Sequence, residues 1–248
     1  MKVSIITATF NSENTVIDTL HSLNQQTYPD IEYIIIDGGS SDNTVSVINQ
    51  NCPRVSKIIS EPDKGIYDAL NKGIGIATGD VVGFLHSDDL FAYPEAVQDL
   101  VDAMNNGDAQ AVYADLEYVS KNDTSKVIRK WVSGPFKREY LRFGWMPPHP
   151  TFFMRREIYN RCGMFDLGMK ISADYDSLLR YLWGSQINVT YLPKVVTKMR
   201  VGGASNRSLK NIIEKTKEDV KALKNNNISW PVALFMKNFS KIPQFFKR

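Results

Sequence analysis

The stretch Gly83-Phe84-Leu85-His86-Ser87-Asp88-Asp89 places two adjacent carboxylates directly after an apolar segment. Together with the two valines at 81 and 82, this segment is typical of a buried strand. Ionised carboxylates are costly to bury without partners, so the pair must be exposed at the strand end, paired, or bound to a cation. Ligands of open α/β sheets bind at the carboxyl ends of strands. The alternative is that Asp88 and Asp89 are solvated and cap the next helix.

Three more apolar segments precede this strand, and each leads through polar residues into a helical pattern. The segments are residues 3–8, 31–36 and 55–60. Strands that alternate with helices predict a parallel sheet with right-handed crossovers. Because parallel strands end at the same edge, we expect Asp37, Asp63 and the pair Asp88 and Asp89 to converge there. Such a site favours cations and hydroxyl-rich ligands.

The pattern changes after residue 110. Residues 109–119 and 127–132 are expected to form antiparallel strands, and further strands are expected at residues 151–154, 187–192 and 195–200. Residues 133–146 are rich in aromatic and basic side chains and are expected to form a loop or short helix over the site. Their aromatic rings would either stack on a sugar ring or pack as a lid.

The composition is that of an ordinary globular protein, with 43% hydrophobic and 23% charged residues among 248. The sequence contains no run of 18 apolar residues, so we expect no transmembrane helix. Residues 1–6 are too short and too quickly polar for a signal peptide. Cys52 and Cys162 stand in unrelated contexts, which indicates neither a disulfide framework nor a zinc site. These features predict a cytoplasmic protein.

The charge is distributed unevenly along the chain. Residues 205–248 carry ten Lys or Arg against three Asp or Glu, a net charge of +7, whereas the remainder carries 20 against 24, a net charge of −4. Large apolar residues alternate with the basic ones over residues 228–248, as in segments that dock on anionic membranes. The alternative is a helix that packs on the body or on a second subunit.

Four motifs taken together resemble the family 2 glycosyltransferases of the GT-A fold, inverting enzymes that use nucleotide sugars to build bacterial surface polysaccharides. The motifs are residues 4–11, residues 34–44, residues 63–65 with 69–73 and 79–80, and residues 84–89. The resemblance implies an α/β fold of GT-A (Rossmann-like) type, with a mixed, mostly parallel sheet flanked by helices. It also implies a domain over residues 1–205, whose nucleotide-sugar-binding half is 1–110 and whose acceptor-binding half is 111–205. A basic helical extension would follow over residues 206–248.

The resemblance also implies roles for residues at the donor end of the site. Asp37 would hydrogen-bond the donor base, uracil in a UDP-sugar, Asp88 would hold the ribose or sugar, and Asp89 would bind Mn²⁺ or Mg²⁺. The donor-binding residues implied in this way are Thr7, Thr9, Asn11, Asp37, Asp63, Lys64 and Asp88. His86 and Ser87 depart from the fuller acidic form of the metal motif, and His86 would either neighbour the metal or pack at the strand end.

Asp174 matches the second acid of the family's acidic pair, which is the catalytic base, and Ala173 replaces the first acid. A carboxylate on the face opposite the leaving group can take the proton of the acceptor hydroxyl as it attacks. Asp176 is a nearby alternative, and Ser172 or Asp174 could instead serve as a helix N-cap. Three more residues either contact the acceptor or pyrophosphate or are structural: His149, Arg180 and Arg200.

The sequence therefore predicts a metal-dependent inverting glycosyltransferase. Its partners would be a nucleotide-sugar donor and a glycan or lipid-linked acceptor in cell-surface polysaccharide synthesis, such as that of lipopolysaccharide. No nucleic-acid partner is expected, and a homodimer and a peripheral contact of residues 228–248 with the inner face of the membrane are candidates. Two alternatives stay open. A nicotinamide-dependent oxidoreductase is opposed by the first strand–helix turn, which lacks Gly-x-Gly-x-x-Gly. A non-catalytic binding protein of the same fold is favoured by Ala173 alone.

Overall fold

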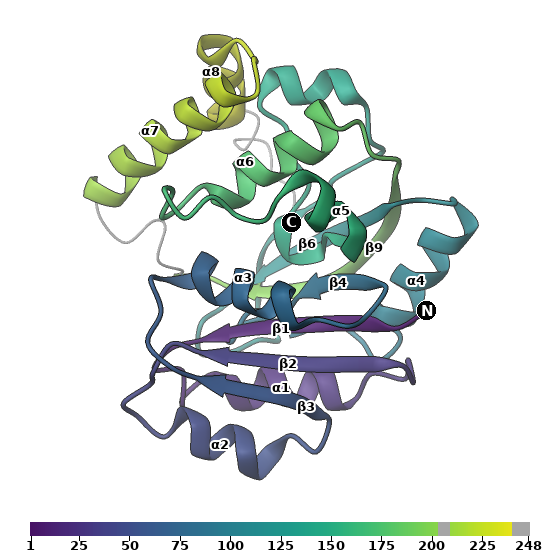
Figure 1. The fold of residues 1–248 in the computed structure, drawn as a ribbon, viewed down its shortest axis with the longest axis vertical. Helices are drawn as coiled ribbons and strands as arrows, with labels where there is room; N and C mark the ends of the chain where they lie inside the picture. Colours follow the sequence, from purple (N-terminus) through teal and green to yellow (C-terminus); the bar gives the residue numbers. More distant parts are fainter. Residues whose placement is uncertain (203–208, 240–248) are drawn as a thin grey trace.

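The computed structural model describes residues 1–202 and 209–239, and it has a central sheet with helices on both faces (Figure 1). The first half consists of β1 (Val3–Thr9), α1 (Val16–Asn24), β2 (Ile31–Asp37), α2 (Thr44–Asn51), β3 (Val55–Ser60), α3 (Ile66–Ile76), β4 (Val81–Phe84), β5 (Leu90–Phe91) and α4 (Ala96–Asn106). The second half contains β6 (Ala111–Val119), β7 (Val127–Trp131), the 3₁₀ helices η1 (Arg138–Phe143) and η2 (His149–Thr151), β8 (Phe153–Arg155), α5 (Arg156–Cys162), α6 (Ala173–Leu179), the π-helical η3 (Arg180–Gly184), β9 (Val189–Arg200), α7 (Leu209–Asn225) and α8 (Trp230–Phe239).

The strand order is β3-β2-β1-β4-β8-β6-β9-β5, and β7 pairs with β6. The first four strands run parallel, and β6 is parallel to β9 over its whole length. Antiparallel pairs join β8 to β4 and β6, β5 to β9, and β7 to β6. The predicted α/β fold with a mixed, mostly parallel sheet and a helical C-terminal region is thus confirmed.

Alternation along the buried strands builds a separate hydrophobic core on each face of the sheet. In β1, Val3 and Ile5 pack with residues of α1, α2 and α4, whereas Ile6 and Ala8 pack with residues of α3, α5 and α6. Both faces of the strand are therefore covered, which explains its continuous apolar sequence.

The C-terminal helices are part of the hydrophobic core that contains Ile6 and Ala8 of β1. Leu223 of α7, Ile228 of the connection and Ala233 of α8 are buried in the same cluster as α6. For residues 209–239, packing on the body is therefore observed. The predicted boundary at residue 205 and the apolar and basic residues of 240–248 lie outside the described residues.

One expected pair of strands was wrong, and one short strand was not predicted. Residues 187–192 and 195–200 were expected to be two strands, but β9 is continuous, and the residues between Leu192 and Val195 form a bulge opposite β6. The two-residue strand β5 was missed because it is too short to show a period. Gly73 and Gly75 both lie inside α3, where Gly73 allows close contact with Ile6 of β1.

These two glycines give a matched test of packing. A Cβ at position 73 would lie 2.5 Å from Cγ2 of the fully buried Ile6, whereas no described atom lies within 4 Å of a Cβ at position 75. We expect Gly75→Ala to raise the free energy of unfolding by about 0.5–1 kcal/mol through helix propensity. Gly73→Ala should lower it by about 1–2 kcal/mol, because overpacking outweighs the same gain. Urea denaturation measures both, and equal effects would contradict the close packing of α3 on β1.

Candidate active site

Strands β2, β1 and β4 end side by side, and polar residues follow each end. The register pairs Thr9 with Asp37 at the ends of β1 and β2, and Ile6 with Phe84 at the end of β4. The chain that continues beyond Phe84 therefore brings Asp88 and Asp89 to the same edge of the sheet as Asp37.

Asp37 organises the turn that follows β2. Its side chain is completely buried, and Oδ2 accepts hydrogen bonds from the N–H groups of Gly39 (3.2 Å) and Ser40 (2.9 Å) and from the Ser60 hydroxyl (2.6 Å). The last of these bonds ties the turn to the end of β3. The carboxylate thus fixes the shape of the loop, and a contact between Asp37 and a nucleotide base remains a prediction.

The loop after β1 is joined to the same turn by Asn11. Its backbone has a positive φ of 47°, its N–H donates to Ser40 Oγ at 2.8 Å, and its Oδ1 accepts from the Ser41 N–H at 2.9 Å. The neighbouring Phe10 is 61% exposed, an unusual environment for a large aromatic side chain. Phe10 was not among the predicted site residues, although its place between Thr9 and Asn11 was visible in the sequence.

The two threonines of β1 differ in their surroundings. Thr7 is completely buried, and its hydroxyl bonds the Tyr33 hydroxyl (2.9 Å) and the Leu85 carbonyl (2.5 Å). Thr7 joins neighbouring strands in this way, and its side chain does not line an open pocket as the resemblance implied. Thr9 is also buried, but its hydroxyl has no hydrogen-bond partner among the described residues, which leaves it available to a ligand.

The loop after β3 approaches from the other side. Asp63 Oδ1 accepts from the Gly65 N–H at 2.7 Å, and its Oδ2 lies so close to Gly38 that a Cβ there would be 2.6 Å away. Only glycine fits at position 38 without a shift of this carboxylate. Lys64 is exposed, and its backbone N–H donates to Asp68 at 3.0 Å. Asp63 is thus brought beside the Asp37 turn, as the sequence predicts.

Asp89 is a buried carboxylate whose charge is not compensated by a direct bond. Its side chain is 1% exposed, and neither carboxylate oxygen has a hydrogen-bond partner among residues 1–202 and 209–239. Burial raises the pKa of Asp89 well above its usual range and the charge of Asp88 raises it further, whereas the nearby backbone N–H of Arg200, which lies outside ordinary hydrogen-bond geometry, and the charge of Arg200 oppose the shift. The backbone is nevertheless well held, because the Asp89 carbonyl accepts from the Thr19 hydroxyl at 2.8 Å.

Arg200 braces the acidic pair from the end of β9. The side chain is 6% exposed, it donates to the Asp88 carbonyl (2.9 Å) and the Lys121 carbonyl (3.2 Å), and it forms an ion pair with Asp18. Of the two roles left open by the sequence, the geometry favours the structural one. This role had no local signal in the sequence, because Arg200 and Asp88 are 112 residues apart.

Asp174 lies in the first turn of α6, which follows Ser172 at the N-cap position. Its Oδ1 accepts from the Tyr67 hydroxyl at 3.2 Å and from the Tyr175 N–H at 2.8 Å, so the carboxylate also supports the start of the helix. The charge of Asp174 acts on the pKa of both His86, which follows β4, and His149 of η2. The predicted base therefore lies within electrostatic range of His86, which follows β4 and precedes the acidic pair.

The rings of His86 and His149 lie close to each other and to Phe84 at the end of β4. The His149 ring stacks on Phe84 with centroids 5.1 Å apart and lies 6.2 Å from His86. Burial lowers the pKa of His149 to about 4, the charge of Asp174 opposes this shift, and His86 adds to it. Burial also lowers the pKa of His86. Both imidazoles are thus neutral near pH 7 and are available for hydrogen bonding.

Asp176 and Arg180, which the sequence left as alternatives, are engaged elsewhere. Asp176 is 3% exposed, forms an ion pair with Arg180 (3.0 Å) and accepts from Asn226 at 3.3 Å. Arg180 also donates to the carbonyls of Gly163 (3.2 Å) and Met164 (2.6 Å). The pair fastens α6 to the turn before it, which leaves Asp174 as the better candidate base.

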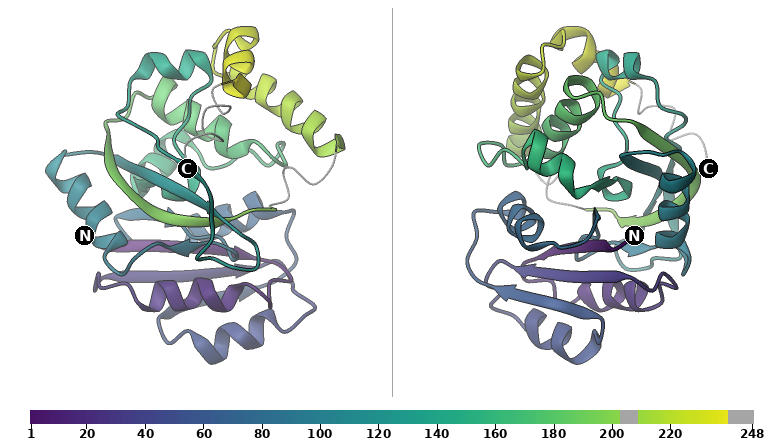
Figure 2. Two further views of the ribbon diagram at one scale, coloured as in Figure 1. Left: turned by 180° about the vertical axis from the view of Figure 1, so that it is seen from behind. Right: turned by 45° about the vertical axis from the view of Figure 1, so that its right-hand side comes forward.

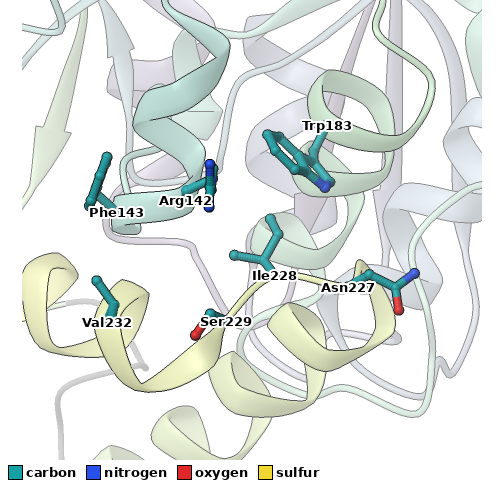
Figure 3. Close-up of a pocket in the computed structure, with 7 residues that line it drawn as sticks. All are labelled: Arg142, Phe143, Trp183, Asn227, Ile228, Ser229 and Val232. Atoms are coloured by element: carbon teal, nitrogen blue, oxygen red, sulfur yellow. The ribbon is translucent and has the colours of Figure 1, made fainter.

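The aromatic segment 133–146 mainly packs against itself and the sheet. Trp145 contacts Phe136, Tyr140 and Tyr113 of β6, with centroids 5.8, 6.4 and 5.7 Å away. A pocket of about 610 Å³ lies between η1, η3 and the start of α8 (Figure 3). Its lining consists of Arg142, Phe143, Trp183, Asn227, Ile228, Ser229 and Val232.

A divalent cation fits the acidic pair. The two unpartnered oxygens of Asp89 are hard ligands in a buried position, as Mg²⁺ and Mn²⁺ prefer. Nowhere in the described ranges do three or more His, Cys, Asp or Glu side chains gather as a metal-holding group.

Residues 4–166 match the family described as Glycosyl transferase family 2. The chain is 34% identical over 180 residues to an uncharacterised glycosyltransferase of Mycobacterium tuberculosis H37Rv, a match that covers 72% of this chain and 68% of that protein. It is 29% identical over 208 residues to a PGL/p-HBAD biosynthesis glycosyltransferase of Mycobacterium bovis BCG, which covers 82% of this chain and 78% of that protein.

Solved structures share the fold at low sequence identity. Staphylococcus aureus TarS 1–349 in complex with UDP-GlcNAc has a TM-score of 0.73 at 18% identity, over 99% of this chain and 78% of that chain. The mannosyltransferase PcManGT from Pyrobaculum calidifontis, in complex with GDP-Man and Mn²⁺, has a TM-score of 0.68 at 17% identity. This match covers 97% of this chain and 69% of that chain. The chain spans 44% of a longer TarS chain.

The burial of Asp89 predicts a trade between stability and cation binding. The pKa of Asp89 is higher in the folded protein than the roughly 3.9 of an Asp in an unfolded chain. Protonated Asp89 therefore favours the folded state at low pH, and this contribution to the free energy of unfolding is lost as the pH rises through the pKa of the folded protein. Asp89→Asn should therefore raise the free energy of unfolding of the metal-free protein more at pH 8 than at pH 5, because the neutral amide removes the cost of burying a charge. Mn²⁺ should stabilise the wild type but not this variant.

Thermal unfolding between pH 5 and 8, with and without Mn²⁺, measures both effects. Asp102→Asn, on the exposed face of α4, is the control and should follow the wild type. An equal response of the wild type and Asp89→Asn to Mn²⁺ would contradict the assignment of Asp89 as a cation ligand.

Proposed function

The chain belongs to glycosyl transferase family 2, and we propose that it transfers a sugar from a UDP-sugar to a hydroxyl group of a glycan or lipid-linked acceptor, with inversion at the anomeric carbon. Family membership supports a transferase. The observations that carry the finer proposal are the buried Asp89 carboxylate, which has no bonding partner in the described chain, and Asp174 of α6, whose charge acts on His86, three residues before Asp89.

The donor end is proposed to lie over the loops that follow β1 and β2. The Asp37 turn and Asn11 fix these loops, and Phe10 exposes an aromatic face beside them that suits stacking of a nucleobase. The unpartnered hydroxyl of Thr9 is a further polar contact, with Asp63 and Lys64 beside it. UDP as the carrier is supported by the UDP-GlcNAc complex of TarS, which has the same fold.

Asp89 is proposed to hold Mn²⁺ or Mg²⁺, and Asp88 to contact the ribose or the sugar. The cation would neutralise the diphosphate leaving group as a Lewis acid. The Mn²⁺ complex of PcManGT supports a cation in this fold. Arg200 and Thr19 hold the backbone of the acidic pair, so the side chain of Asp89 needs no rearrangement before it binds.

Asp174 is proposed to take the proton of the acceptor hydroxyl as that oxygen attacks. Tyr67 donates to one carboxylate oxygen and orients it, which leaves the other oxygen for the acceptor. The anomeric carbon becomes oxocarbenium-like, and a single in-line displacement inverts its configuration. The neutral rings of His86 and His149 line the space beside Asp174, where they can hydrogen-bond sugar hydroxyls without a competing positive charge.

The non-catalytic alternative receives no support from Ala173. This side chain is completely buried in the core that α6 shares with α7. An acid at this position would be buried among apolar residues at considerable cost, so its replacement is explained by packing.

Cell-surface polysaccharide synthesis, lipopolysaccharide included, is proposed as the pathway, and one relative is named for PGL/p-HBAD biosynthesis.

A cytoplasmic enzyme that docks on the inner face of the membrane is proposed from the outer face of α8. Among residues 1–202 and 209–239, no helix is long and apolar enough to cross a membrane. Four large apolar side chains of α8 are nevertheless 39–58% exposed: Trp230, Val232, Phe235 and Met236. Phe143 is exposed beside the pocket next to Arg142, and Lys224 lies 5.9 Å from the Trp230 ring, which gives the basic and aromatic character of a membrane interface.

Substitution of the two carboxylates separates their proposed roles. We expect Asp89→Ala and Asp174→Ala each to abolish measurable transfer, a loss of about 10²–10⁴-fold for the general base. Only Asp89→Ala should weaken Mn²⁺-dependent binding of UDP, because Asp174 does not contact the nucleotide. Titration calorimetry with UDP and Mn²⁺ and a turnover assay with UDP-sugars measure these effects. Unchanged turnover in Asp174→Ala would refute the base assignment.

Membrane docking predicts a different set of effects. Deletion of residues 228–248 is unsuitable as a test, because Ile228 and Ala233 are buried in the core. The double substitution Val232→Ser and Phe235→Ser should instead reduce sedimentation with anionic liposomes by about tenfold or more, given about 1.5–3 kcal/mol for each buried apolar side chain. Ile213→Ser, an equally exposed site in the first turns of α7, is the control. Sedimentation equal to that of the wild type would argue against docking through α8.

A further inference from the structure

Glu218 of α7 bonds the backbone segment that leads into α6. The side chain is 6% exposed, Oε1 accepts from the Lys170 N–H at 2.7 Å, and Oε2 accepts from the N–H groups of Ile171 and Ser172 at 2.8 Å each. Asp174 follows two residues later. One carboxylate therefore fixes three successive amides immediately before the proposed catalytic base.

A second contact holds the residue on the other side of Asp174. The ammonium group of Lys237 on α8 lies 3.2 Å from the centroid of the Tyr175 ring and 3.0 Å from Asp219 Oδ1 on α7. All three side chains are at most 5% exposed. The two C-terminal helices thus contact the chain both before and after Asp174, and Figures 1 and 2 show α7 running beside α6.

The contacts of Glu218 are more specific than general packing requires. A buried carboxylate costs several kcal/mol unless its oxygens are satisfied, and apolar side chains fill such space at lower cost. Bonds between N–H groups and a carboxylate are short and directional, so they fix the position of the amides as well as their spacing from α7. Tyr67 adds to the same arrangement, because its hydroxyl lies within hydrogen-bond distance of both the Ile171 carbonyl (2.8 Å) and Asp174 Oδ1 (3.2 Å) and can donate its one proton to either.

We propose that Glu218 is a positioning residue, which sets the place of Asp174 relative to the acidic pair at the end of β4. This inference rests on the proposed function, in which Asp174 is the base. A displacement of about 1 Å in a reacting group can reduce a rate by about 100-fold. Loss of the three bonds should therefore act on the chemical step and leave the donor loops, which lie on other elements, unaffected.

The variant Glu218→Gln tests the proposal, because it keeps the shape of the side chain but replaces one acceptor oxygen by a donor. We expect kcat for transfer to fall by about 10- to 100-fold. KM for the UDP-sugar and the affinity for UDP with Mn²⁺ should stay within about twofold, since donor binding does not use Asp174. Glu214→Gln, an exposed position one turn earlier on α7, is the matched control and should keep the wild-type kcat.

Two further measurements separate positioning from a general loss of structure. Hydrogen exchange at amides 170–172 should accelerate in Glu218→Gln, while exchange in β1 and β4 stays unchanged. In an Asp174→Asn background, Glu218→Gln should have no additional effect on residual transfer, because both act through the same group. Glu218→Asp, which keeps the charge on a shorter side chain, should show a smaller loss of kcat than Glu218→Gln, and this variant serves if the Gln variant does not fold.

The outcomes distinguish a failure of the proposed role of Glu218 from a failure of the proposed transferase function. Normal transfer by the wild type, together with unchanged kcat in Glu218→Gln or with equal losses in kcat and UDP affinity, would overturn the role of Glu218 alone. Failure of the wild type to transfer sugar from any UDP-sugar would overturn the proposed function and, with it, this role.

Discussion

The burial of Asp89 is the constraint on which the site depends. Burial of an ionised carboxylate with no hydrogen-bond partner in the described chain lowers stability, while the backbone around it is held firmly. Thr19 bonds the carbonyl of Asp89, and Arg200 bonds that of Asp88. Neither bond uses the carboxylate oxygens. The side chain is therefore kept in place and left reactive, which is the usual exchange of stability for function at a binding site.

The parallel sheet positions the other residues of the proposed donor site. Strands β1, β2 and β4 are fully buried by helices on both faces, so their polar residues gather where the strands end. Each loop then satisfies its own acid: the Asp37 carboxylate bonds its own turn, and Asp63 bonds the amide of Gly65. Asp89 differs because its oxygens lack such partners within the described residues, and this contrast singles it out among the acids at this edge.

The sequence predicted what local pattern and spacing determine. Apolar runs located the first four strands, and the acids expected at their ends do lie at one edge of the sheet. The sequence did not predict the roles of residues whose contacts are with segments far away in the chain. Thr7 resembled a pocket residue, but its neighbour across the sheet, Tyr33, and the covering layers bury it. Arg200 and Glu218, which are proposed to support the site, bond backbone groups 112 and 46–48 residues away. No helical or strand period records such bonds, because they arise only when distant elements pack.

Local and non-local contacts determine different parts of the molecule, and these parts can tolerate different substitutions. The loops proposed to bind the donor are short, internally bonded and contained in residues 7–89, within the segment that matches the family. Asp174 and the helix that braces it lie beyond residue 166, where the match ends, and their placement depends on contacts among α6, α7 and α8. Substitutions in these helices can move the proposed base and reshape the acceptor side while the donor loops stay intact. A fold built in this way can keep one donor chemistry and change its acceptor, because the two ends are held by different sets of bonds.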